Sequence, residues 1–350
     1  MTSLTQVSIL SRKIIRYAIY TIILIVIGYY SYQIGTKIYR KYVPAPPPPP
    51  TLIFGKLPKI PFPIPENEVP KDLVFTLETA TGKLPKLPKQ AAIYFMPPSI
   101  STIKALDSAK QKAASLGFNP EGTENVPTVY DFRSITAPVS LNLNIVTGVF
   151  SIYFDLNSRP SVLENIPPDP TQATALAKTY LSRAKSLPGD LSGPATTEYL
   201  KIQDGKFVTA SSLSDANVTK INLYRKNYNN LPNVTKTRNQ ANVWFMFSGA
   251  KAIGEQVIAA EYKYFSIDEN KSGTYPLITA EAAWEKLKSG AAYFSNIESK
   301  SNGNITVRKV YLAYYDPDKF TEFYQPVLVF EGDDNFSAYV SAVSPDYIQQ

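Results

Sequence analysis

The sequence predicts an α+β protein in which an N-terminal transmembrane helix and a proline-rich spacer precede repeated units of a helix and an antiparallel sheet. An uncharged apolar stretch near the N-terminus leads into a run of prolines at residues 46–50. After residue 90, three segments with helical spacing are each followed by short alternating stretches. Because helices do not alternate one-to-one with strands, we expect antiparallel sheets with one covered and one solvent-exposed face, not a doubly wound sheet.

The apolar stretch at residues 17–35 predicts a single transmembrane helix. It holds 19 residues without a charge, and as a helix it would span roughly 28 Å, close to the hydrocarbon thickness of a bilayer. Tyrosines gather near both of its ends, as at membrane interfaces. A buried core helix and a cleaved signal peptide are the alternatives. We expect residues 1–16 to be a cytoplasmic tail and the larger C-terminal part to be extracytoplasmic.

The positive charge lies beside this stretch. The chain has a net charge of +7, and its first 50 residues contain no acidic residue. The basic residues of that region are Arg12, Lys13, Arg16, Lys37, Arg40 and Lys41. The remaining 300 residues carry 30 basic and 29 acidic residues. This location is typical of lipid headgroup contact, and it disfavours nucleic acid as a partner.

The sequence contains no cysteine and no histidine. Disulfides, Cys–His and Ser–His nucleophile pairs, the usual zinc sites and histidine pH switches are therefore excluded. We expect no cofactor.

Residues 36–90 are predicted to be a basic and proline-rich linker. The run at 44–50 favours polyproline II, which would act as a stiff spacer, and a ligand for a proline-reading domain is the alternative. Residues 58–65 hold four prolines and cannot continue a helix or a central strand. The short apolar run at 73–77 is expected to pair as an edge strand.

Three amphipathic helices are predicted after the linker. The first ends at Gly117, the second begins with Asp169 as N-cap and Pro170 at the first helical position, and the third runs from Thr279 to Gly290. The apolar positions of the first two are Ile103, Leu106, Ala109, Ala113 and Leu116, followed by Ala173, Leu176, Tyr180, Ala184 and Leu187.

Strands follow each helix. Residues 140–146 and 149–154 flank a Thr-Gly turn, and residues 199–202 and 206–209 flank Gln-Asp-Gly, so both pairs are predicted hairpins. Further strands are expected at 220–228, 243–247, 257–265, 307–315, 327–330 and 336–342. The helix-plus-sheet units are placed at 91–168, 169–272 and 273–350, and the last two form either separate domains or one.

Two parts of the chain resemble known extracytoplasmic modules. The helix at 109–116 and the hairpin at 144–150 resemble PepSY-type modules, and residues 278–290 with 325–343 are similar to the repeats of YycH/YycI-type regulators. Those regulators are single-pass proteins thought to bind and restrain a membrane partner. The resemblance implies a regulatory or binding role, and this sequence has no recognisable catalytic signature, so we expect no enzyme activity.

A serine hydrolase is the alternative interpretation. Ser101 and Lys104 fit S-x-x-K, Ser140 and Asn142 fit S-x-N, and residues 271–273 fit K-[ST]-G, the set of penicillin-binding enzymes. However, S-x-x-K recurs at 182–185 and K-S-G at 288–290, so chance explains these patterns. The large helical subdomain of those enzymes is also missing. An envelope hydrolase acting on cell-wall polymer, through these residues or through paired carboxylates, remains the second hypothesis.

Five carboxylates are weak calcium candidates because they cluster in two short stretches. They are Asp316, Asp318, Glu331, Asp333 and Asp334. Neither stretch is a full calcium loop, so polar loops between strands are the favoured interpretation. A carbohydrate-binding module is a third hypothesis, and it predicts an exposed row of Tyr or Trp on one sheet face. Trp244 and Trp284 are expected to be core anchors.

The sequence thus predicts a membrane-anchored, extracytoplasmic, non-catalytic protein that binds or regulates a protein partner in the cell envelope. It contacts the lipid bilayer through residues 17–35.

Overall fold

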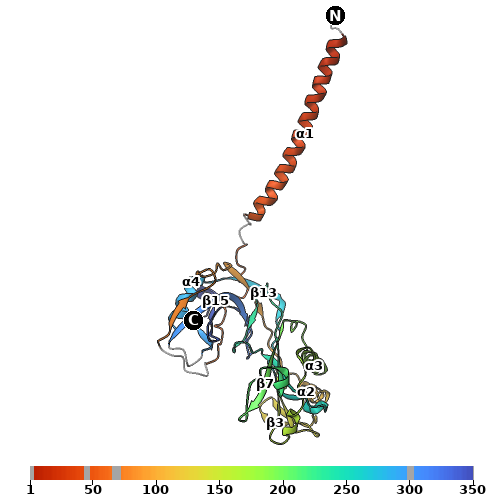
Figure 1. Ribbon diagram of the computed structural model, residues 1–350, viewed down its shortest axis with the longest axis vertical. Coiled ribbons are helices and arrows are strands. Elements are labelled where there is room, and N and C mark those ends of the chain that lie inside the picture. Colours follow the sequence, from red (N-terminus) through yellow and green to blue (C-terminus); the bar gives the residue numbers. More distant parts are fainter. Residues whose placement is uncertain (1–3, 43–47, 65–71, 298–302, 350) are drawn as a thin grey trace. The chain divides into compact units, whose positions relative to one another are not determined.

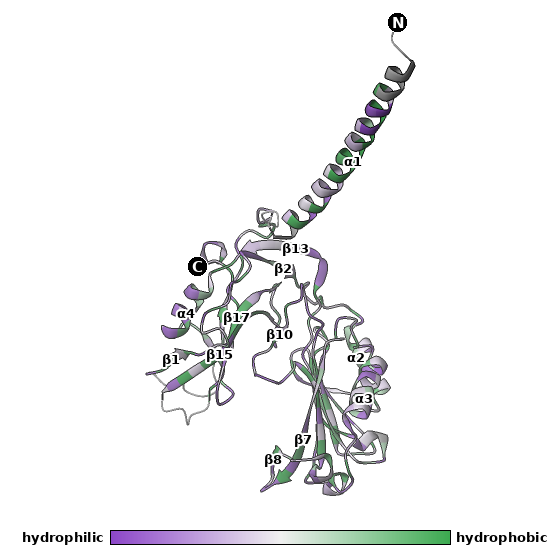
Figure 2. Cartoon of the chain, turned by 45° about the horizontal axis from the view of Figure 1, so that its top comes forward, coloured by the Kyte–Doolittle hydropathy of each residue, from purple (hydrophilic) through white to green (hydrophobic). Residues whose placement is uncertain are grey.

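A computed structural model describes residues 4–42, 48–64, 72–297 and 303–349, and it divides the chain into two compact units, 1–49 and 50–350. The first unit is the single helix α1 (Leu4–Tyr42). It extends beyond both ends of the predicted span at 17–35. At its C-terminal end the helix stops shortly before Pro44, the first proline in the sequence. Figure 2 shows its apolar middle. Its 30-residue stretch Leu10–Tyr39 is long and apolar enough to cross a membrane, and none of its most apolar window is buried. In the described part of the chain α1 is therefore not a buried core helix, and a membrane anchor and a signal sequence remain as the two interpretations.

The second unit contains a nine-stranded antiparallel sheet in the order β3-β4-β5-β6-β12-β11-β9-β7-β8. Figure 1 labels two of its strands, β3 and β7. Both predicted hairpins are confirmed within it, as β5–β6 and β7–β8. In the second hairpin Asp204 and Gly205 have φ values of 52° and 73°, as a two-residue type I′ turn requires. Its strands are β3 (Thr123–Val126), β4 (Val129–Arg133), β5 (Val139–Asn144), β6 (Phe150–Phe154), β7 (Ala195–Gln203), β8 (Lys206–Thr209), β9 (Val218–Leu223), β11 (Val243–Ser248) and β12 (Val257–Tyr262).

A six-stranded sheet follows the order β1-β15-β17-β18-β14, with β10 also paired to β15. The predicted edge strand at 73–77 is confirmed as β1, which pairs with β15 in parallel. A three-stranded sheet in the order β13-β2-β16 lies in the same unit. The strands of these two sheets are β1 (Val74–Leu77), β10 (Asn233–Val234), β14 (Tyr293–Asn296), β15 (Asn304–Tyr315), β17 (Pro326–Gly332), β18 (Ser337–Ser341), β2 (Gln90–Phe95), β13 (Asp268–Pro276) and β16 (Phe323–Tyr324).

Three helices of the second unit pack on these sheets, as predicted. They are α2 (Ala105–Ser115), α3 (Pro170–Arg183) and α4 (Ala280–Lys288). The predicted caps are confirmed, since Asp169 accepts from the Gln172 N–H at 2.9 Å and Thr279 from the Ala282 N–H at 3.2 Å.

Two predicted core positions were wrong. Ile103 is fully exposed because α2 begins two residues after it, and Leu187 is 40% exposed because α3 has already ended.

The nine-stranded sheet buries one face, as expected. Helices α2 and α3 share a hydrophobic core with inward-facing residues such as Leu141, Phe245 and Ile221. The other face carries polar side chains, among them Asn142 and Lys220, and the 62% exposed Tyr153.

The six-stranded sheet differs from expectation because both of its faces are covered. Phe336, Ala338, Val340 and Ala342 share one core with α4, as the alternation predicted. The opposite face buries a second core. Its members are Ala313, Tyr315, Val327, Val329 and Tyr339.

The segment that follows the predicted proline rod forms part of this cover. Phe62 stacks on Tyr293 with 5.1 Å between ring centroids and lies edge-on to Tyr315 at 5.0 Å. Leu57 is fully buried and pairs with Ile348 near the C-terminus. Part of the predicted spacer region is thus packed on the folded body, whereas residues 43–47 of the rod lie outside the described residues.

Candidate functional site

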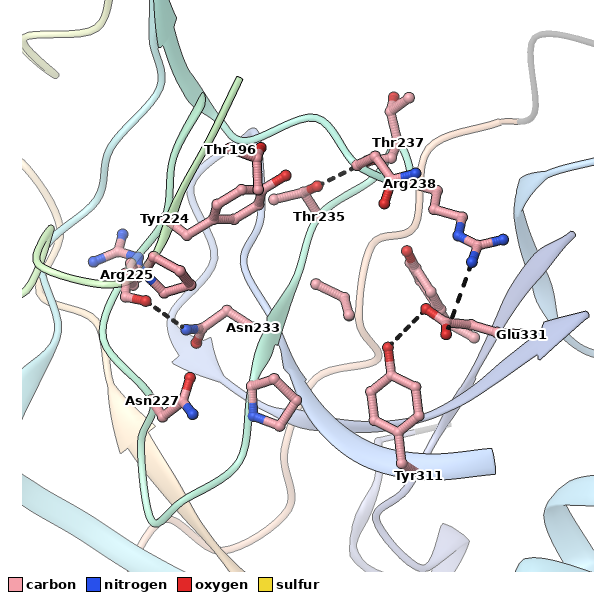
Figure 3. A pocket seen from close by; sticks show the side chains of 15 residues that line it. Thr196, Tyr224, Arg225, Asn227, Asn233, Thr235, Thr237, Arg238, Tyr311 and Glu331 are labelled. Carbon is pink, nitrogen blue, oxygen red and sulfur yellow. Dashed lines mark hydrogen bonds and ion pairs between the residues drawn. The ribbon is translucent and has the colours of Figure 1, made fainter. Parts of the chain in front are cut away.

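A polar pocket of about 230 Å³ lies between residues 224–239 and the second face of the six-stranded sheet (Figure 3). Tyr311 on β15, Glu331 on β17 and Tyr339 on β18 line it from the sheet side. These three alternate in phase with the buried residues Ala313 and Val329, so they belong to the same face. The pocket therefore occupies a part of that face that the proline-rich segment does not fill.

Residues 224–228 leave the nine-stranded sheet to form the opposite wall. The sequence predicted a strand to residue 228, but β9 ends at Leu223. The reason is a change of backbone partners: the Gly193 N–H donates to the Tyr224 carbonyl, and the Lys226 N–H donates to the Asp190 carbonyl at 2.7 Å. The chain then turns toward β10.

The fully buried guanidinium of Arg225 fixes this turn. It donates to Asp190 at 2.7 Å, to Asp316 at 2.9 Å and to the Phe265 carbonyl at 2.6 Å, and it lies 4.0 Å from the centre of the Tyr264 ring. All three nitrogens are thus used within the fold. Arg225 joins four separate chain segments, and its side chain is not free to bind a ligand.

The two carboxylates beside Arg225 are shifted in opposite directions. Burial raises the pKa of Asp316, and Arg225 only partly offsets this. Burial also acts on Asp190, but Arg225 and the hydroxyls of Tyr264 and Tyr228 outweigh it, so the pKa of Asp190 is lowered. Of the two acids that share Arg225, Asp316 therefore keeps its proton to a higher pH than Asp190.

Apart from the buried Arg225, the pocket is lined by one positive and one negative side chain, Arg238 and Glu331. Tyr311 donates to Glu331 at 2.9 Å, while Arg238 Nη2 lies 3.8 Å from the same carboxylate, beyond hydrogen-bond distance (Figure 3). Arg238 Nη1 donates to the Phe336 carbonyl at 3.1 Å. Burial, followed by the charge of Glu331, raises the pKa of Tyr311, and burial raises the pKa of Tyr224 to about 12. Both phenols therefore stay protonated and able to donate.

Several uncharged polar side chains of the pocket have no partner in the fold. Within the described part of the chain, the side chains of Asn227, Thr237 and Asn239 make no hydrogen bond. Asn233 differs, since its amide is occupied by the carbonyls of Arg225 and Lys226. The free groups lie at the exposed side of the pocket.

The structure does not gather the five calcium candidates. Asp316 pairs with Arg225, Asp318 with Lys236 at 3.1 Å, and Asp333 with Arg308 at 3.0 Å. Glu331 lines the pocket, and Asp334 occupies a turn at φ 49°. Among the described residues, no group of three or more Asp, Glu, His or Cys side chains could hold a metal.

The residues of the serine hydrolase motif lie on different elements. Ser101 precedes α2, so it is not one helical turn from Lys104, which is the residue just before that helix. Ser140 and Asn142 lie in the middle of the nine-stranded sheet. Lys271 on β13 places its ammonium 3.8 Å from the centre of the Phe95 ring.

A serine–lysine contact that the sequence did not predict joins α2 to the end of α3. Lys112 Nζ donates to Ser186 Oγ at 2.8 Å, and burial lowers the pKa of Lys112. Ser186 is 7% exposed, and its hydroxyl donates to the Ala184 carbonyl at 3.2 Å. No sequence pattern could pair residues 74 positions apart.

The tryptophans are half-buried. Trp284 packs edge-on against Phe75, and Trp244 lies 5.5 Å under the Lys220 ammonium. The most exposed aromatic residues of the described body, Tyr153, Phe207 and Phe320, come from separate segments and form no row.

Of the residues that line the pocket, only Glu331 was among the predicted site residues. One usable signal was overlooked: asparagines at 227, 229, 230, 233 and 239 are typical of turns rather than of a long strand.

No protein-family model matches the chain, and no curated protein matches its sequence. Among solved structures, an uncharacterized protein from Eubacterium rectale ATCC 33656 is similar, with a TM-score of 0.35 and 11% identity over 72% of this chain and 82% of that one. The Bacillus megaterium YpeB C-terminal domain is similar with a TM-score of 0.32 and 12% identity, over 71% of this chain and 95% of that domain. These likenesses are weak and say nothing of function.

Proposed function

We propose that this chain is a single-pass membrane protein whose extracytoplasmic body binds and regulates a protein partner in the cell envelope, without catalysis. The observation that carries this proposal is α1, one continuous helix of 39 residues with an uncharged middle. At 1.5 Å per residue it is roughly 58 Å long, about twice the hydrocarbon thickness. Such a helix crosses a bilayer and extends into water at its ends, where the basic residues lie.

The length of the apolar stretch in α1 and the basic residue that follows it favour an anchor over a signal sequence. Lys37 follows the apolar stretch directly and lies in the same helix. A signal peptide has a shorter apolar region and ends in small residues before its cleavage site, neither of which is found here.

Two sheet edges are the surfaces best suited to a protein partner. Strands β3 and β8 end the nine-stranded sheet and have one neighbour each within it. Both are largely exposed, and they carry Val126, 58% exposed, and Phe207, 39% exposed. Exposed edges with unpaired backbone groups accept an added strand from another chain.

Membrane placement can be tested with single cysteines because the chain has none. Ser8→Cys marks the tail and Ser192→Cys marks an exposed position of the body. A membrane-impermeant maleimide should label only the body in intact cells and both positions after permeabilisation. Labelling of the tail alone in intact cells would show that the orientation is the opposite of the one proposed. A mature protein that has lost residues 1–42 would refute the membrane anchor.

Partner binding can be tested with a photo-crosslinking residue at position 207 or 126, with position 135 as the control. Ile135 is 84% exposed but lies in a turn. We expect one defined crosslinked protein from an edge position and none from the control. The same product from all three positions, or none at all, would contradict binding at the edges.

One contact favours the second hypothesis of an envelope hydrolase. The serine–lysine pair Ser186–Lys112 has the distance and the lowered lysine pKa of a nucleophile and its base. However, its serine is buried and bonded to a carbonyl, which favours a structural contact. Ser186→Ala should therefore leave partner binding intact, and loss of a wall-polymer hydrolysis on this substitution would instead establish the hydrolase.

A further inference from the structure

We propose that the pocket at residues 224–239 binds a single neutral sugar ring, such as an N-acetylhexosamine unit of an envelope glycan. This inference goes beyond the protein-binding role proposed above and concerns a different part of the body. It does not depend on the orientation of α1 or on either sheet edge.

The charges that face the pocket define the class of ligand. The charged side chains that face it, apart from Arg225, are Arg238 and Glu331, which have opposite sign and lie 3.8 Å apart. The guanidinium of Arg225 is already used by Asp190 and Asp316. A phosphate or a nucleotide would meet one arginine together with one carboxylate, so its charge would not be compensated. A neutral ligand meets no such penalty.

The polar and aromatic side chains that line the pocket indicate which neutral ligands fit it. Glu331 accepts and Arg238 donates, while Asn227 and Asn239 can do both. Donors and acceptors that line one space match a ring of hydroxyl groups, each of which also donates and accepts. The tyrosines 224, 311 and 339 add apolar ring surface that suits the C–H face of a sugar. An apolar ligand would leave the free polar groups desolvated without partners.

The size of the pocket favours one ring. Its volume of about 230 Å³ lies below the usual range of pockets that enclose drug-sized molecules, roughly 300–1,000 Å³. A longer glycan would place one residue here and extend along the exposed side, where Thr237 and Asn239 lie. An extended peptide would need a longer groove.

Saturation-transfer NMR on the full chain tests this proposal. The protein is held in a zwitterionic detergent, since detergents with sugar headgroups would compete. The probes are N-acetylglucosamine and glucose, with inorganic phosphate, free glutamate and a tri-alanine peptide as competitors. We expect saturation transfer to sugar ring protons at millimolar concentration and no competition from the other three compounds.

Three variants assign the binding to this pocket. Glu331→Gln keeps the shape of the side chain and removes its charge, and we expect it to weaken sugar binding about tenfold. Asn227→Ala alters an exposed side chain that makes no hydrogen bond within the described part of the fold, so we expect a severalfold weakening of binding with an unchanged free energy of unfolding in urea. Tyr153→Phe, on an exposed strand position outside the pocket, is the control and should leave binding unchanged.

The proposal is overturned by any of three results. These are the absence of transfer to either sugar at millimolar concentration, displacement of the sugar by phosphate, glutamate or peptide, and full sugar binding in both pocket variants. None of these results bears on the labelling of α1 or on crosslinking at the sheet edges, so failure here is distinguishable from failure of the proposed function.

Discussion

The nine-stranded and six-stranded sheets show the same alternating pattern of residues in the sequence, but they differ in how many of their faces are buried. Strands β5 and β18 both alternate residues between two faces. In β5 the second face is half-exposed and carries Asn142 and Asn144, whereas in β18 it carries the buried Tyr339. The alternation alone therefore does not show whether the second face is covered. A tyrosine there does not decide it either, because Tyr153 on the open face of the nine-stranded sheet is 62% exposed.

The covered face of the six-stranded sheet also explains where the pocket lies. Residues 60–62 pack over one part of this face, and residues 233–238 lie over another. The pocket lies under the second of these covers, between residues 224–239 and the sheet. Among the described residues, the open face of the nine-stranded sheet is covered only in part: Tyr153 is 62% exposed, whereas Asn222 on the same face is fully buried.

The largest expected effect is that of Arg225→Met, which tests whether the two sheets unfold together. The substitution leaves Asp190 and Asp316 buried without their cation, and removing one partner of a buried ion pair costs about 3–5 kcal/mol. We expect this loss in urea unfolding of the full chain in micelles, with a second transition as the sheets uncouple. Arg308→Met, at a 49% exposed pair, should cost far less, because water and salt screen an exposed ion pair. Equal small losses would show that Arg225 does not join the sheets.

The next largest effect on stability concerns residues 60–62, which cover part of the second face of the six-stranded sheet. Phe62→Ala removes the ring that stacks on Tyr293, and because Phe62 is half-buried we expect a loss of about 2 kcal/mol, below the range for fully buried phenylalanine. Ile64→Ala in the same segment is the matched control, since Ile64 is 91% exposed. The free energy of unfolding from chemical denaturation measures both. If the two variants behave alike, residues 60–64 do not stabilise the second face.

This contrast shows what could be predicted from the sequence. Local signals such as Asp169 before Pro170 and the Asp204-Gly205 turn depend on neighbouring residues, and they were confirmed. The cover of the six-stranded sheet depends on Phe62 meeting Tyr315, more than 250 positions away, and no local pattern contains that contact. The pocket was not predicted for the same reason, because Asn227 and Glu331 converge only through the turn at Arg225. The extended helix α1 was underestimated because only its uncharged part was considered.

The pH dependence of stability separates the two carboxylates that share Arg225. The pKa of Asp190 is lowered in the fold, so its stabilising contribution is present above its unfolded pKa of about 3.9 and is lost as pH falls through the folded value. The pKa of Asp316 is raised, so its contribution is greatest below about 3.9 and is lost as pH rises through its folded value. The two contributions oppose each other, and the sum is a shallow dependence on pH.

Substitution of each acid should expose the contribution of the other. Asp316→Asn should leave a stability that falls clearly in acid, whereas Asp190→Asn should leave one that falls as pH rises above about 4. Urea unfolding of the full chain at a series of pH values measures both slopes. If the two variants show slopes of the same sign, the assignment of the shifts to these residues is wrong.

The smallest effect compares two helix caps on the two sheets. Asp169→Ala and Thr279→Ala each free one N–H at the start of α3 and α4, and a lost N-cap costs about 1 kcal/mol. The bond of Asp169 is shorter, 2.9 Å against 3.2 Å, and its charge also favours the positive end of the helix, so we expect the larger loss at α3. Added salt should shrink the Asp169 effect and leave the Thr279 effect unchanged, because only the charged cap is screened. A salt response of equal size in both variants would mean that the charge of Asp169 contributes nothing to α3.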